Sequence, residues 1–163
     1  MELPKRQKIR LENYDYAQNG AYFITICTHN RKKILSNISV GATNGRPPIL
    51  HLTKYGKIVE DGIKNITNKY PSITVDKYII MPDHIHLILM IQNDKNGRPM
   101  VAPTIGRVIN QTKGHISKQI GFSIWQKSYY DHVIRNQEDY NEIFEYIENN
   151  PKRYALENCD TEV

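Results

Sequence analysis

Apolar and polar positions alternate with two different periods along the chain, and these periods predict strands and helices in turn. Four runs rich in aromatic and β-branched residues have the length and the flanking turn residues that are typical of strands. These predicted strands cover residues 21–28, 72–81, 84–91 and 128–135. Three other segments carry apolar residues at helical spacing. These predicted helices cover residues 53–70, residues 103–120 and a last segment that Asn136 can cap.

The order of these elements predicts the fold class. Residues 29–52 and 92–102 carry Gly and Pro and are expected to be loops. Strand, helix, strand, strand, helix, strand and a final helix predict an α+β ferredoxin-like sandwich, a four-stranded antiparallel sheet with helices packed on one face. In this topology the first and third strands form the central pair. We expect one domain over residues 1–151 and a C-terminal tail over residues 152–163.

Composition narrows the class of protein. The 163 residues are 39% hydrophobic and 24% charged, which is typical of a globular protein and excludes a disordered one. The apolar stretches are too short to span a membrane and the N-terminal segment does not read as a secretory signal, so no membrane partner is expected. Two cysteines imply no disulfide framework and favour a cytoplasmic, nucleoid-associated location.

Charge and aromatic content point to a class of partner. The net charge is +5, with basic clusters at residues 5–10 and 31–33, and the chain has eleven tyrosines but only three phenylalanines. Cations that neutralise phosphates and rings that stack on bases are what single-stranded nucleic acid requires. A solvated surface with tyrosines at its edge is the alternative interpretation of the same composition.

The segment His84-Ile85-His86 is the strongest candidate for a metal site. Side chains alternate along a strand, so His84 and His86 point to one face and Ile85 to the other. Two imidazoles on one rigid strand are suitable ligands for a divalent ion. Two ordinary histidines that are satisfied by hydrogen bonds remain the alternative.

The predicted helix over residues 103–120 offers further polar groups. Helical geometry places Gln111, His115 and Gln119 along one edge of its apolar stripe. The Gln119 carbonyl oxygen is a plausible third ligand for Mg²⁺ or Mn²⁺. An amphipathic helix with polar edges explains the same pattern without a metal.

Four longer motifs carry a resemblance to a known family. They occupy residues 9–35, 52–61, 78–91 and 124–151, and the third contains MPDHIHL with Ile85 between the histidines. The chain resembles the HUH single-tyrosine transposases of bacterial insertion sequences, and within them the REP-associated tyrosine transposases. The resemblance covers almost the whole chain.

The resemblance implies a fold and a reaction. A ferredoxin-like domain would bind single-stranded or hairpin DNA, and a helix after the histidine strand would carry a nucleophilic tyrosine, often with a glutamine four residues later. The metal would polarise the scissile phosphate, and the tyrosine would form a 5′-phosphotyrosine and release a 3′-hydroxyl. Relatives act as homodimers or as monomers, so both assemblies are expected alternatives.

The expected spacing places the nucleophile at His115, four residues before Gln119, and residues 103–120 contain no tyrosine. Three explanations are open. The protein is a catalytically dead hairpin-DNA-binding protein, or Tyr129 or Tyr130 replaces the missing tyrosine, or His115 itself attacks. Only one of the two tyrosines can face the site, since they are neighbours on a strand.

The sequence thus predicts a metal-dependent DNA transposase that cleaves and rejoins a strand. A non-catalytic binder and a metal-dependent nuclease in which water attacks are the alternatives. Basic and aromatic residues near the predicted site are expected to contact DNA. These candidates are Arg31, Lys32, Lys33, Lys113, Lys118, Trp125, Lys127 and Arg135.

Overall fold

A computed structural model of the chain describes residues 19–41, 46–92 and 103–159. Its main sheet has four strands in the order β4-β5-β1-β6, and each strand is antiparallel to its neighbours. The predicted α+β class and antiparallel sheet are therefore confirmed, as is the central position of the first strand and the histidine strand. The bounds are β1 (Gly20–Cys27), β4 (Ile73–Ile80), β5 (His84–Ile91) and β6 (Tyr130–Ile134).

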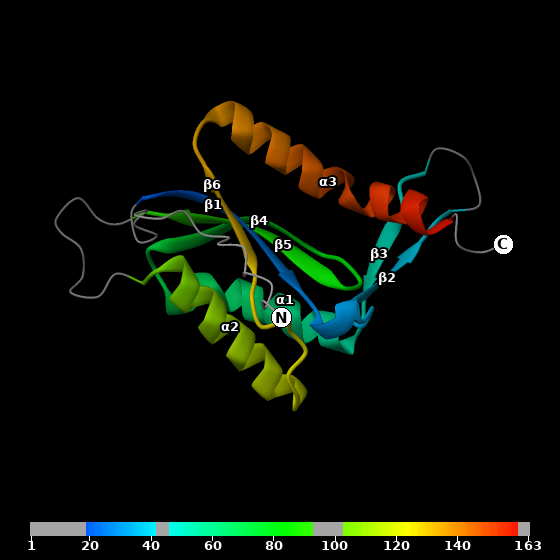
Figure 1. The fold of residues 1–163 in the computed structure, drawn as a ribbon, viewed down its shortest axis with the longest axis horizontal. Helices are drawn as coiled ribbons and strands as arrows, with labels where there is room; N and C mark the ends of the chain where they lie inside the picture. Colours follow the sequence, from blue (N-terminus) through cyan, green and yellow to red (C-terminus); the bar gives the residue numbers. More distant parts are fainter. Residues whose placement is uncertain (1–18, 42–45, 93–102, 160–163) are drawn as a thin grey trace, which may run out of the picture.

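Helices cover both faces of this sheet (Figure 1). Helices α1 (Lys54–Lys69) and α2 (Ile105–Ile120) pack together on one face, and α3 (Gln137–Cys159) crosses the other. The expectation that the helices pack on one face thus holds for α1 and α2 only. The reason is that β5 is apolar on both faces, so that a single helical layer would leave one face in water.

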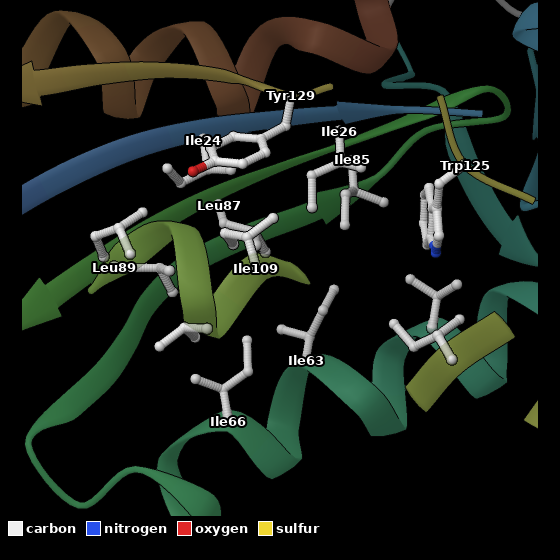
Figure 2. Packing of buried hydrophobic residues seen from close by; sticks show 14 of the residues in the cluster. Ile24, Ile26, Ile63, Ile66, Ile85, Leu87, Leu89, Ile109, Trp125 and Tyr129 are labelled. Carbon is white, nitrogen blue, oxygen red and sulfur yellow. The ribbon is translucent and has the colours of Figure 1, made fainter. Parts of the chain in front are cut away.

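The larger core lies between the sheet and the first two helices. Figure 2 shows Ile63 of α1 and Ile109 of α2 among the strand residues Ile24, Ile85 and Leu87. A smaller cluster on the opposite face is formed by buried residues of β1, β5 and α3, namely Phe23, Ile88 and Ile147. Since residues 85 and 87 face one layer, residues 84, 86 and 88 must face α3.

Local hydrogen bonds set the helix ends close to where the sequence predicts them. The Thr53 side chain accepts a bond from the Gly56 amide (3.1 Å), and Thr104 does the same at the start of α2 (3.2 Å to the Arg107 amide). Helix α2 ends at Gly121, whose φ of 100° is left-handed and favours glycine. Asn136 accepts a bond from the Asp139 amide (2.8 Å), as predicted.

Two segments differ from the predictions. The region expected to be a loop, residues 29–52, contains a short 3-10 turn (His29–Arg31) and a separate two-stranded sheet of β2 (Ser36–Ser39) and β3 (Ile49–Leu52). Helix α3 continues through Pro151, so that residues 152–159 of the predicted tail are helical, while the predicted domain boundary at residue 151 stays a prediction. The predicted loop over residues 92–102 lies almost wholly outside the described residues. Within the described ranges, no helix is long and apolar enough to cross a membrane.

Candidate functional site

The two histidines of β5 lie side by side on the face that α3 covers. Their ring centroids are 4.7 Å apart, and both side chains line a cavity of about 270 Å³ between the sheet and α3. Only 7% of His84 and 3% of His86 is exposed. Both imidazoles thus lie on one face of β5, as the alternation of side chains along a strand predicts.

Each imidazole is anchored through its Nδ1 atom. Nδ1 of His84 lies 2.7 Å from Oδ1 of Asp83, and Nδ1 of His86 lies 2.8 Å from Oγ1 of Thr25, its partner across the β1–β5 ladder. When Nδ1 carries the proton and donates in both bonds, the Nε2 lone pair of each ring is left as an acceptor. Anchored imidazoles with free Nε2 lone pairs are the usual form of metal-binding histidines.

Arg31 holds the Asp83 carboxylate from the other side. Its Nε lies 3.1 Å from Oδ2 of Asp83. Burial raises the pKa of the Asp83 carboxyl, but the bond from His84 and the charge of Arg31 outweigh this effect and keep the pKa below its usual value. Asn30 and Arg31 both have a φ of 53°, a conformation that costs free energy in residues other than glycine. The turn therefore presents Arg31 to the site under local backbone strain.

His86 is held in its neutral form. Burial, helped by electrostatic interactions with His84 and Arg31, lowers the pKa of His86 to about 3. The imidazole therefore carries no charge at neutral pH, and its Nε2 atom can accept a hydrogen bond or bind a metal.

Helix α3 adds a tyrosine and an amide to the histidine pair. Nδ2 of Asn150 lies 3.3 Å from Nε2 of His86, and the Tyr146 ring centroid lies 5.4 Å from that of His86. The guanidinium of Arg153 lies 5.0 Å from the centroid of the Tyr146 ring. These residues recur at intervals of three and four and thus share one face of α3.

A second tyrosine of α3, Tyr154, lines the same cavity. Its hydroxyl is buried, and burial together with the negative charge of Asp83 raises the pKa of Tyr154. A raised pKa disfavours the phenolate that a nucleophile needs. Tyr146, which is 40% exposed, is open to a substrate.

The expectation that His115 and Gln119 join the histidine pair is not met within this chain. Helix α2 packs on the face of Ile85, whereas the histidines face α3. Nε2 of Gln119 lies 3.0 Å from Nε2 of His115, and His115 lines a different cavity, between α1 and α2. The alternation of side chains along β5 separates the two groups by the thickness of the sheet.

The two alternative tyrosines point to opposite faces, as predicted for neighbours on a strand. Tyr129 is 9% exposed and packs in the core with Ile24 and Leu87 (Figure 2). Tyr130 is 49% exposed and lines a cleft beside His86. Trp125 is only 5% exposed and belongs to the same core, so the prediction that it stacks on DNA is wrong for this conformation.

The predicted basic contacts divide into three groups. Arg31 lines the histidine cavity, and Lys33 lies beside it with Nζ 5.7 Å from the Tyr154 ring centroid. Lys113 is buried, and its Nζ donates to the carbonyl oxygen of Gln126 at 2.8 Å, so its predicted role in DNA contact is wrong. The remaining candidates are exposed but do not line that cavity, namely Lys32, Lys118, Lys127 and Arg135.

The sequence carried a signal for Tyr146 and Asn150. A tyrosine followed four residues later by an amide side chain occurs twice on α3, as Tyr146 with Asn150 and as Tyr154 with Asn158, in both cases with asparagine in place of the glutamine that the resemblance implies. The resemblance directs attention to the helix that directly follows the histidine strand, residues 103–120. On that helix the position four residues before Gln119 is His115. Only the placement of α3 over the histidines distinguishes the two choices.

The residues present fit a divalent ion bound by nitrogen and oxygen. Among the described residues, no three His, Cys, Asp or Glu side chains cluster as a metal site. A metal would therefore depend on the two Nε2 atoms of His84 and His86 and on the carbonyl oxygen of Asn150, with the amide turned so that this oxygen takes the place that Nδ2 now has beside His86. The open cavity beside them leaves room for substrate oxygens.

Comparisons with known proteins identify the family of the chain and its fold. The family model described as "Transposase IS200 like" matches residues 16–150. An uncharacterized protein of Haemophilus influenzae is 32% identical, over 90% of this chain and 88% of its own length. The REP-associated tyrosine transposase of Escherichia coli is 22% identical, over 86% of this chain and 71% of its own. A solved structure of a REP-associated tyrosine transposase bound to a REP hairpin has a TM-score of 0.63 and 20% identity, covering 89% of this chain and 74% of that one.

Proposed function

The chain belongs to the IS200-like transposase family, and on this premise we propose that it cleaves and rejoins single-stranded or hairpin DNA through a covalent bond to Tyr146. One observation supports this role above all others. Tyr146 and Asn150 of α3 converge on the buried imidazole of His86, with the Asn150 amide 3.3 Å from Nε2. A nucleophile, a metal-binding pair and an oxygen ligand thus share one open cavity.

The proposed reaction is a transesterification at phosphorus. The Tyr146 phenolate attacks the scissile phosphate, the bond from phosphorus to the 3′-oxygen breaks, and that oxygen takes up a proton to become a 3′-hydroxyl. The 5′-phosphate stays on Tyr146 as a phosphodiester. A 3′-hydroxyl that attacks this phosphotyrosine restores the phenol and the DNA linkage, so that rejoining needs no external energy source.

His84, His86 and Asn150 are the residues that would hold Mg²⁺ or Mn²⁺. A bound divalent ion would supply positive charge to the phosphate oxygens as a Lewis acid. The protein's own part is to fix both imidazoles through Asp83 and Thr25 and to keep His86 neutral.

DNA with a hairpin is the substrate that we propose. The structural relative is bound to a REP hairpin, and this chain carries a net charge of +5. Arg31 and Arg153 line the candidate cavity, and Lys33 stands next to it. Cations around a tyrosine suit the phosphates on either side of a scissile bond.

The two alternatives differ in what remains attached to the protein. A catalytically dead binder was suggested by His115, but Tyr146 supplies a tyrosine at the histidine pair without it. A nuclease that uses water would cut without a covalent intermediate. Absence of any cut, or a cut without an adduct, separates these cases from the proposed reaction.

The test uses end-labelled hairpin DNA from the flanks of its own gene, incubated with the protein and Mn²⁺ and resolved on a denaturing gel. We expect a protein–DNA adduct from the native protein and from His115→Ala, and none from Tyr146→Phe. Cleavage products with free 5′-phosphate ends and no adduct would instead assign the protein to the nucleases.

A further inference from the structure

The cavity lined by His84, His86, Arg31 and Arg153 is called the cationic cavity below. A second cleft adjoins it on the side of β6. Its volume is about 610 Å³, within the range of about 300–1,000 Å³ that accommodates small ligands. The two share Thr25, His86 and Tyr146, so that they meet at the proposed nucleophile. The paired strands β1 and β6 form the floor of the second cleft, where Tyr130 pairs with Thr25 and His132 pairs with Phe23.

Three aromatic rings line this cleft in different orientations. Phe23 lies edge to face with Tyr130 (centroids 6.4 Å apart, planes at 72°) and with Tyr146 (6.2 Å, 88°). Tyr130 is 49% exposed and Tyr146 is 40% exposed. Solvent-exposed rings next to a backbone-binding site are the surfaces on which unpaired bases stack.

The charges of the cleft differ from those of the cationic cavity. Arg31, Arg153 and Glu157 line the cavity but not the cleft. Apart from tyrosines and the shared His86, the ionisable groups of the cleft are His132, Asp139 and Glu142. Asp139 is engaged, since its Oδ2 lies 2.9 Å from Nε2 of His132 and accepts a bond from the Arg135 amide at 3.2 Å. Glu142 stands exposed at the rim. A phosphate would be repelled from such a cleft, whereas a base would not.

We infer that this cleft binds the unstacked base of a nucleotide flanking the scissile phosphate, with a preference for guanine; this inference rests on the proposed function. An ionised carboxylate only accepts hydrogen bonds. Guanine presents two adjacent donors, N1–H and the N2 amino group, on its pairing edge. Adenine and cytosine present one amino donor beside an acceptor, and thymine presents one N–H between two acceptors. The Glu142 carboxylate therefore matches guanine, while the rings provide the stacking surface.

The test measures binding in the Tyr146→Phe variant, which keeps the ring but cannot form the adduct. A set of hairpin oligonucleotides with single-stranded arms is prepared, each with one arm nucleotide replaced by an abasic unit, and Kd is measured by fluorescence anisotropy. We expect one position at which base removal weakens binding about tenfold. At this position guanine should bind about tenfold tighter than thymine.

Further variants identify the cleft as the source of the effect. In the same background, Glu142→Gln should reduce the guanine preference at that position to about twofold or less, and Tyr130→Ala should reduce the loss caused by the abasic unit. Glu145→Gln, an exposed residue on the same helix that does not line the cleft, should change neither value.

The outcomes separate this inference from the proposed function. If the native protein forms the adduct but no arm position responds to base removal, the cleft does not bind a base and the transposase reaction stands. If one position responds but no adduct forms, the base site stands and the cleavage proposal falls. A guanine preference unaffected by Glu142→Gln would also overturn the inference.

Discussion

The side-chain amide of Asn150, on the last helix, lies 3.3 Å from Nε2 of His86, on a central strand of the sheet. The two residues are 64 positions apart in the chain, and they meet because α3 packs on the face of the sheet that carries His86. This contact places Tyr146, one turn earlier on α3, beside the same imidazole.

Removal of the Asn150 oxygen is expected to weaken metal binding. Asn150→Ala should raise the Kd for Mn²⁺ by at least about tenfold, the lower end of what loss of an outer-shell partner costs. Asn150→Asp should retain the affinity, since a carboxylate oxygen is a ligand for the same ion. Calorimetric titration of the DNA-free protein provides the measurement. Gln119→Ala is the control, and a loss in that variant equal to that of Asn150→Ala would contradict the assignment.

Asp83 is expected to act through His84. Asp83→Asn should weaken Mn²⁺ binding by about 10–100-fold, because the neutral amide oxygen accepts the bond from Nδ1 of His84 more weakly and no longer pairs with the charge of Arg31. Asp61→Asn, an exposed change on α1, should leave the titration unaltered. The account of the anchored imidazole would be wrong if both variants bound the ion as the native protein does.

The neutral state of His86 predicts a pH dependence of stability in the presence of EDTA. The pKa of His86 is about 3 in the folded protein and about 6.5 in the unfolded chain. The unfolded state therefore binds the extra proton first, and the free energy of unfolding falls as the pH drops from about 6.5 to 3. One such proton contributes a slope of at most about 1.4 kcal/mol per pH unit.

The lowered pKa of Asp83 acts in the same direction at still more acidic pH, because a carboxylate that is stabilised in the fold loses that stabilisation on protonation. His86→Gln should reduce the slope between pH 6 and pH 4, as measured by urea unfolding at each pH. An identical slope in this variant would show that another group carries the dependence.

Two glycines on helices predict opposite changes in stability. A Cβ at Gly56 would lie 2.0 Å from the carbonyl oxygen of Leu35, so Gly56→Ala must displace backbone and should destabilise the fold by about 2–4 kcal/mol. Gly114 on α2 has no heavy atom within 4 Å of such a Cβ, so Gly114→Ala should stabilise it by about 0.5–1 kcal/mol. Thermal unfolding measures both changes. The Gly56 variant tests the packing of α1 against the segment before β2, and the Gly114 variant tests the open surface of α2.

The pattern of apolar and polar positions was sufficient to predict the four strands of the main sheet and the shared face of the histidine pair. Strand periodicity shows that His84 and His86 share one face of β5, and the helical spacing predicts the bounds of α1 and α2 to within two residues. The short strands β2 and β3 have four residues each and lie in a Gly- and Pro-containing segment, so that their periodicity is too brief to detect.

The rest of the site depends on contacts that are distant in sequence. No local pattern decides which face of a doubly apolar strand receives α2 and which receives α3, and this choice separates His115 from Tyr146. Likewise the apolar stem of Lys113 and the ring of Trp125 are buried by tertiary packing, although both residue types are common in DNA contacts.

The identity of the residue that carries the DNA tests the central claim most directly. The covalent complex formed with hairpin DNA and Mn²⁺ is digested with nuclease and protease, and the modified peptide is sequenced by mass spectrometry. We predict a nucleotide on the Tyr146 hydroxyl and no complex from Tyr146→Phe. A nucleotide on His115, Tyr130 or Tyr154, or a complex that persists in Tyr146→Phe, would contradict this account.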